Sequence, residues 1–210
     1  MGYGADPAAV LDIVAEHAVR GAVVVKGNHD EAAAGSKREY FNETAASAIE
    51  WTRATLSGPQ REMLSSLPLV VREGNACFVH ASAAAPERWE YVDSAGAAER
   101  SAAAAAKPYT FCGHVHRQVL YGIDAHGRMV AFHPHPGVAI PVRANRAWLA
   151  IAGSVGQPRD GDPSAAYALA DTERQTITFH RVAYDSAAAA RKIRAAGLPE
   201  ALAWRVERGA

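Results

Sequence analysis

The chain is poor in cysteine, in long apolar runs and in net charge, and each shortage excludes a class of protein. Its 2 cysteines lie in apolar, strand-like segments, which favours buried side chains over a disulfide framework. No apolar run reaches the roughly 18 residues of a membrane span. Lys and Arg (22) balance Asp and Glu (22), so no basic field indicates nucleic acid. The first residues lack the pattern of a signal peptide, and we expect a cytoplasmic protein.

The remaining composition is that of a globular protein. Hydrophobic residues make up 49% of the 210 residues, which is enough for a sizeable core. We expect residues 1–210 to form a single domain. Helices alternate with apolar strands early in the chain, and antiparallel strands dominate later, so we expect an α/β layered fold with mixed sheets.

Caps, periodicity and turn residues predict the individual elements. The expected helices are Pro7 to His17, Asn42 to Leu56, Ser57 to Ser66, Ser94 to Ala106, Asp185 to Ala196 and Pro199 to Arg208. The expected strands are Gly21 to Lys26, buried on both faces, Leu69 to Arg72, Ala76 to His80, Tyr109 to Cys112, Val119 to Ile123, Met129 to Phe132, Ala147 to Ala152, Ala165 to Ala170 and Thr176 to Val182. We expect Asn28 to Asp30 to be a loop and Glu31 to Tyr40 a mobile loop.

Three of these strands end in side chains that bind metals. Asn28 and His29 follow the first strand, His80 ends another, and His114 and His116 follow Tyr109 to Cys112 after a glycine. Imidazole nitrogens with one amide oxygen suit manganese, iron, zinc or nickel better than magnesium. A pair of such metals can clamp a phosphoryl oxygen, and a nearby unbound histidine can protonate a leaving oxygen. A Gly-His-X-His turn by itself is equally compatible with two solvated histidines.

The three blocks Gly27-Asn28-His29-Asp30, His80 and Gly113-His114-Val115-His116 resemble, in order and spacing, the calcineurin-like metallophosphoesterase superfamily. The segment Gly153 to Arg159 and the hairpin and helix after it are similar to a subgroup of small bacterial phosphoesterases. The resemblance implies two packed mixed β-sheets flanked by helices, an αββα sandwich. It also implies a phosphatase or phosphodiesterase that hydrolyses small phosphate esters with a metal-bound hydroxide.

The resemblance also implies roles for individual residues. Asn28, His80 and His114 would bind one metal, and His116 would bind another. His29 would be the general acid at the leaving group, with Asp30 orienting it. Arg159 and Asn145 could contact the substrate, although surface roles are equally compatible with their positions.

The chain departs from the family at its start. Members begin with a strand ending in Asp-X-His and a second strand ending in Gly-Asp, and neither motif is present. Gly2-Tyr3-Gly4 matches the end of the second motif, so we expect a domain that lacks the first β-α-β unit. Without these acidic ligands we expect one bound metal or none, impaired activity, and association through an exposed sheet edge.

Other functions stay open from the sequence. A start codon placed too far downstream would explain the missing motifs, and an active enzyme would then need the upstream segment. The chain could instead be a non-catalytic relative that binds or scaffolds a partner, or a protein that binds a single metal. His133 and His135 lie in a proline-rich loop and form a further His-X-His that could bind metal.

Overall fold

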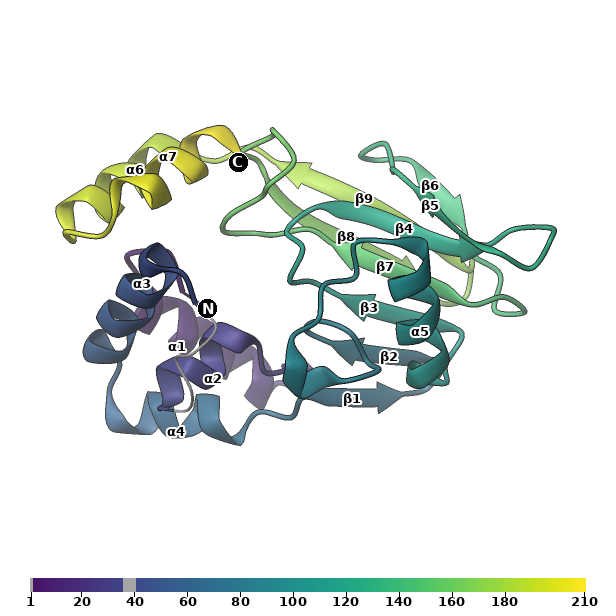
Figure 1. The fold of residues 1–210 in the computed structure, drawn as a ribbon, viewed down its shortest axis with the longest axis horizontal. Coiled ribbons are helices and arrows are strands. Elements are labelled where there is room, and N and C mark those ends of the chain that lie inside the picture. Colours follow the sequence, from purple (N-terminus) through teal and green to yellow (C-terminus); the bar gives the residue numbers. More distant parts are fainter. Residues whose placement is uncertain (1, 36–40) are drawn as a thin grey trace.

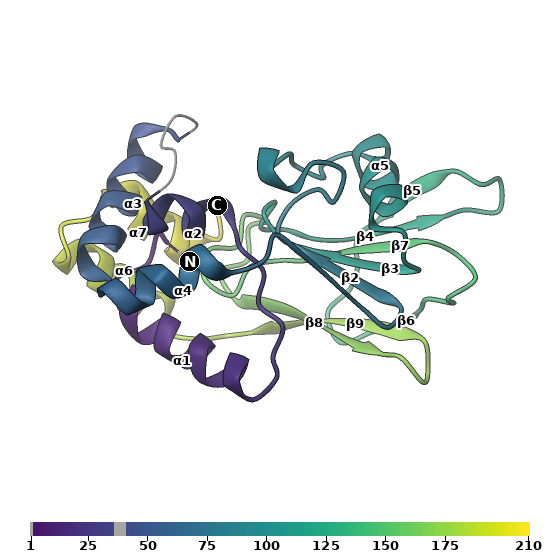
Figure 2. The ribbon, with the colours of Figure 1, turned by 90° about the horizontal axis from the view of Figure 1, so that it is seen from below.

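The computed structural model describes residues 2–35 and 41–210. Two β-sheets pack face to face, with one helix on the outer side of the larger sheet and the other helices gathered at one end of the strands (Figures 1 and 2). The predicted α/β fold class, with two packed sheets flanked by helices, is therefore confirmed, and the larger of the two sheets is mixed. No helix in the described ranges is long and apolar enough to cross a membrane.

The larger sheet has six strands in the order β1-β2-β3-β7-β4-β5. Its strands are β1 (Val70–Glu73), β2 (Ala76–Val79), β3 (Tyr109–Cys112), β4 (Gln118–Ile123), β5 (Met129–Phe132) and β7 (Trp148–Ala152). The neighbours β2, β3 and β7 run parallel, whereas β1 and β4 are antiparallel to their partners. Because parallel neighbours end at the same edge of a sheet, the loops after β2, β3 and β7 meet there.

The smaller sheet is antiparallel, in the order β6-β9-β8. It consists of β6 (Ala139–Pro141), β8 (Ala165–Asp171) and β9 (Thr176–Val182). Side chains of β7 point alternately to the two faces of the larger sheet, one covered by a helix and the other by the smaller sheet. Leu149 and Ile151 point to the face covered by α5 (Ala95–Ala105), and Ala150 points to the cluster shared with Ile177 and Phe179 of β9.

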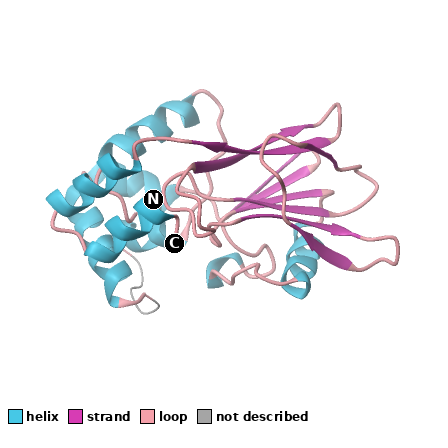
Figure 3. Cartoon of the chain, turned by 90° about the horizontal axis from the view of Figure 1, so that it is seen from above, coloured by secondary structure: helices cyan, strands magenta, loops and turns pink. Residues whose placement is uncertain are grey.

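The other helices form two groups beside the strand ends (Figure 3). Helices α1 (Pro7–Val19), α2 (Asn28–Ala34) and α4 (Gly58–Ser66) share a small core around Leu11 and Leu64, and α3 (Glu43–Thr55) packs on α2. Helices α6 (Ser186–Ala195) and α7 (Glu200–Arg208) pack on each other around Ile193 and Leu202. A short 3-10 helix covers Pro86–Arg88. Two of the predicted caps, Asn42 and Asp185, accept a backbone N–H of the helix they begin, and Ser57 and Ser94 do the same. The predicted cap Asp6 precedes α1 but makes no side-chain hydrogen bond to the backbone of that helix.

The structure corrects two of the predicted elements and adds one strand. Residues 22–27 are not a buried strand: they have no strand partner in the described ranges, Val23 is 41% exposed, and one backbone bond joins Lys26 to Pro68. A run of valines forms a strand only where a neighbour supplies the ladder. Residues 28–34 are helix rather than loop, because Gly27 is extended and the Asp30 carboxylate accepts its N–H at 2.8 Å. Strand β6 was not predicted. Residues 36–40 of the predicted mobile loop lie outside the described ranges.

Candidate metal centre

The five predicted site residues meet in one cavity of about 540 Å³ between the strand ends and the helices. Asn28 and His29 open α2, His80 follows β2, and His114 and His116 lie in the bend between β3 and β4. Topology produces this meeting, because β2 and β3 are parallel neighbours and Gly113 donates its N–H to the carbonyl of His80 at 3.0 Å. The cavity extends over apolar side chains of α1, α6 and α7.

Three donor atoms converge at the centre of this group. The Nε2 atom of His80 lies 3.1 Å from Oδ1 of Asn28 and 3.1 Å from Nδ1 of His114. Two ligands of one divalent metal, each about 2.1 Å from it, lie about 3 Å apart at a right angle. The spacing of these atoms therefore fits a shared metal ion. In the described part of the chain no three His, Cys, Asp or Glu side chains gather as a metal group, so the amide of Asn28 is needed as the third donor.

Contacts from outside the group hold two of the imidazoles in position. His114 forms a hydrogen bond with the backbone of Trp89 and stacks on Tyr91, with ring centroids 4.2 Å apart. His116 donates from Nδ1 to the carbonyl of Gln157 at 2.6 Å, which leaves its Nε2 as the free lone pair. Both histidines have positive φ angles, 64° and 63°, which bulky residues rarely adopt. Strain of this kind is typical of functional sites.

Burial keeps the four imidazoles uncharged. Desolvation lowers the pKa of His29 and of His80 to about 3, with the neighbouring His114 as the next cause for His80. Desolvation also lowers the pKa of His114 and of His116 to about 4, and the positive charge of Arg159 adds to the lowering for His116. Neutral imidazole is the metal-binding form, so the site is prepared for a cation at neutral pH.

His29 lies beside the converging donors rather than among them. Its ring packs against Tyr3, with centroids 4.3 Å apart, and against Phe41 at 5.2 Å. Its Nδ1 atom is buried and has no hydrogen-bond partner within residues 2–35 and 41–210. Gly2 makes the close approach possible, since a Cβ there would lie 2.6 Å from that nitrogen. The position suits a group that exchanges a proton with a ligand.

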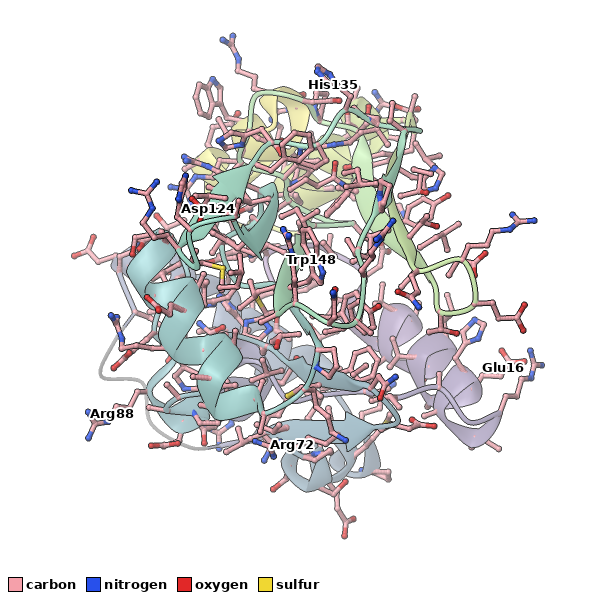
Figure 4. The ribbon with its side chains drawn as sticks, turned by 90° about the vertical axis from the view of Figure 1, so that its right-hand side faces the viewer. Glu16, Arg72, Arg88, Asp124, His135 and Trp148 are labelled. Atoms are coloured by element: carbon pink, nitrogen blue, oxygen red, sulfur yellow. The ribbon has the colours of Figure 1, made fainter. Side chains whose placement is uncertain are left out.

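Sequence reasoning missed two residues of the cavity and left another open. Tyr3, at φ 66°, and Gln157, 3% exposed, both line it. The guanidinium of Arg159 lies 5.8 Å from the centroid of the Tyr3 ring and is therefore close to the site. The glycines around Tyr3 signalled an unusual backbone, but nothing in the sequence indicated which loop it would reach. The His133-X-His135 pair is exposed, and Figure 4 shows His135 at the periphery of the molecule.

The chain is similar to several known proteins. Residues 5–175 match the calcineurin-like phosphoesterase superfamily domain. The chain is 32% identical to an uncharacterized protein of Methanocaldococcus jannaschii over 98% of this chain and 82% of that protein. It resembles a crystal structure of a metallophosphoesterase from Sphaerobacter thermophilus, with a TM-score of 0.87 and 35% identity, over 100% of this chain and 85% of the other. A hypothetical protein from Pyrococcus horikoshii OT3 shares the fold, with a TM-score of 0.78, 17% identity, and coverage of 100% and 82%.

Proposed function

Because this chain belongs to the calcineurin-like phosphoesterase superfamily, we propose that it hydrolyses phosphate monoesters or diesters with the help of a divalent transition metal. The observation that carries the proposal is the convergence of Asn28, His80 and His114. Oδ1 of Asn28 and Nδ1 of His114 each lie 3.1 Å from Nε2 of His80. The two donors that face His80, one oxygen and one nitrogen, come from segments far apart in the chain. Sites that gather such donors are typical of metal centres.

The donor set fits manganese, iron, zinc or nickel. Asn28, His80 and His114 would hold one ion, and His116 offers a single donor for a second, so we propose one bound metal or none in the described part of the chain. When bound, the metal would supply a Lewis acid that polarises a phosphoryl oxygen and lowers the pKa of bound water. The carbonyl of Gln157 would orient His116 toward its ligand.

His29 is the proposed general acid. Burial holds it neutral in the free protein, with a pKa of about 3. The negative charge of a bound phosphate ester would raise that pKa, because an opposite charge nearby favours the protonated form. His29 would then carry the proton and donate it to the leaving oxygen, and the packing of Tyr3 against its ring would fix the direction of transfer.

The test compares hydrolysis of bis(p-nitrophenyl) phosphate and p-nitrophenyl phosphate in the presence of manganese. His29→Gln should lower kcat by about 100-fold to 10,000-fold while the bound metal is retained. His80→Ala should lose the metal and the activity together. His135→Gln, at an exposed position, is the matched control and should behave as wild type.

Each other outcome identifies a different function. Metal binding that depends on His80, without hydrolysis of either ester, would contradict catalysis and indicate a protein that binds a single metal. Well-folded protein that neither binds metal nor hydrolyses ester would indicate a relative that binds or scaffolds a partner.

A further inference from the structure

Gln157 is a buried side chain with an unused hydrogen-bond donor. It is 3% exposed and lines the same cavity as Asn28 and the histidines. Its Oε1 accepts a hydrogen bond from the guanidinium of Arg159 at 3.3 Å, which identifies the other end of the amide as the NH2 group. That nitrogen is buried without a partner in the described ranges. A buried donor left unpaired costs stability, so its retention in a cavity points to a ligand.

Gln118, a second buried glutamine close in space to the same loop, shows how this fold satisfies an amide that has a structural role. Its Nε2 donates to three backbone carbonyls at 3.0–3.2 Å, those of Ala152, Tyr167 and His180. Its Oε1 accepts from Arg181 at 3.0 Å. Both glutamines therefore have an arginine on the oxygen, and they differ in whether the NH2 group is used. The difference separates a structural amide from one that is free to bind.

The loop that carries Gln157 is fixed relative to the metal-site histidines. The backbone N–H of Gln157 donates to Oγ of Ser154 at 2.9 Å, and the carbonyl of Ser154 accepts from the N–H of Ala166 in β8 at 2.9 Å. The carbonyl of Gln157 accepts from His116, and the N–H of Arg159 donates to the carbonyl of His116 at 2.9 Å. The amide is consequently preorganised beside the histidines instead of being ordered when a ligand arrives.

The acceptor that fits this donor is an anionic oxygen. Arg159, whose guanidinium donates to the Oε1 of Gln157 and whose backbone N–H donates to the carbonyl of His116, supplies positive charge beside this donor. Hydrogen bonds from amides to charged oxygens are stronger than those between neutral groups. We propose that the NH2 group of Gln157, oriented by Arg159, donates a hydrogen bond to a phosphoryl oxygen of the substrate. This inference rests on the proposed phosphoesterase function.

The experiment measures binding of inorganic phosphate, by titration calorimetry with and without manganese, to the full chain and to three variants. Gln157→Met removes the donor at nearly constant volume and should weaken phosphate binding about 10- to 100-fold. Gln157→Glu keeps the oxygen that accepts from Arg159 but replaces the donor with a negative charge, and should weaken it further. Gln118→Met is the matched buried control: its Tm should fall, with the phosphate affinity of the folded protein unchanged.

Manganese binding and the kinetics of the diester separate this inference from the proposed function. A substrate-binding role predicts unchanged manganese affinity in Gln157→Met and a loss in both phosphate binding and kcat/KM. If wild type hydrolyses the diester and Gln157→Met binds phosphate equally well, the inference is wrong and the function stands. If no ester is hydrolysed but phosphate binds through Gln157, the function is wrong and the oxyanion site stands. Failure of wild type to bind phosphate at millimolar concentration overturns the inference.

Discussion

Mild acid should destabilise the metal-free protein through its buried histidines. In the folded protein the pKa of His29 and of His80 is about 3, against 6.5 for the unperturbed group. Between these values the unfolded chain binds more protons than the folded one, so acid favours unfolding. The stabilisation contributed by the neutral imidazoles is complete above pH 6.5 and is lost as the pH falls toward the folded pKa.

The size of the effect follows from the shifts. At about pH 5 each of these two histidines lowers the free energy of unfolding by about 2 kcal/mol relative to neutral pH. His114 and His116, with a pKa of about 4, contribute a similar amount at that pH. The four together give an upper bound of about 8 kcal/mol, which is comparable to the whole stability of a typical domain, about 5–15 kcal/mol. Acid should therefore open the site or unfold the chain.

The assay is urea unfolding followed by circular dichroism, with a chelator present, at several pH values from about 7.5 down to about 5. His80→Gln removes one titrating group and should reduce the pH-dependent loss by about 2 kcal/mol at about pH 5. His135→Gln, at the exposed control position, should leave the slope as in wild type. A wild-type free energy of unfolding that stays constant over this pH range would refute the burial of neutral histidines. The same conclusion would follow if the free energy of unfolding of His80→Gln fell with pH as steeply as that of wild type.

Four further predictions concern separate parts of the molecule. Gly153→Ala should lower the free energy of unfolding by about 2 kcal/mol or more, because φ is 92° and the new Cβ would lie 2.6 Å from that of Ala166. Gly161→Ala is the control, because φ there is 85° but no atom lies near the new Cβ. Equal losses of stability in the two variants would contradict a steric clash at Gly153. Tyr109→Phe should cost about 1 kcal/mol in urea unfolding, because its buried hydroxyl donates to the carbonyl of Val142 at 2.7 Å. His114→Ala should abolish tight manganese binding by calorimetry, and retained binding would place the metal elsewhere. Leu169, 56% exposed on the free edge β8, should contribute to self-association, so Leu169→Lys should lower the mass measured by light scattering at high concentration.

Much of the fold follows from local chemistry, because the signals act over a few residues. Asn42 and Asp185 cap their helices as expected, and Gly74-Asn75 turns the β1–β2 hairpin. The segment 22–27 shows the limit of such signals. Its valines have strand propensity, but a strand needs a partner, and in the described ranges no strand pairs with this segment.

The residue types of the candidate site could also be predicted from the sequence, because they follow local apolar runs. Histidines directly after apolar runs indicate the ends of strands β2 and β3, and the ends of parallel strands converge. The apolar run before Asn28 is not a strand, so its place in the site did not follow from this rule. The sequence could not say that Asn28 begins a helix, nor which donor atoms would face one another. These depend on the pairing of β2 with β3 and on the backbone of α2, both of which are non-local.

The sequence by itself determined the residue types of the candidate metal centre and the strands that precede His80, His114 and His116. Only the tertiary structure decided that side-chain atoms of Asn28 and His80, 52 residues apart, lie 3.1 Å from each other, and that the NH2 group of Gln157 is buried without a partner in the described residues. The physical reason is that propensity and capping are properties of neighbouring residues. Burial, desolvation and unpaired hydrogen bonds arise only when distant segments pack together.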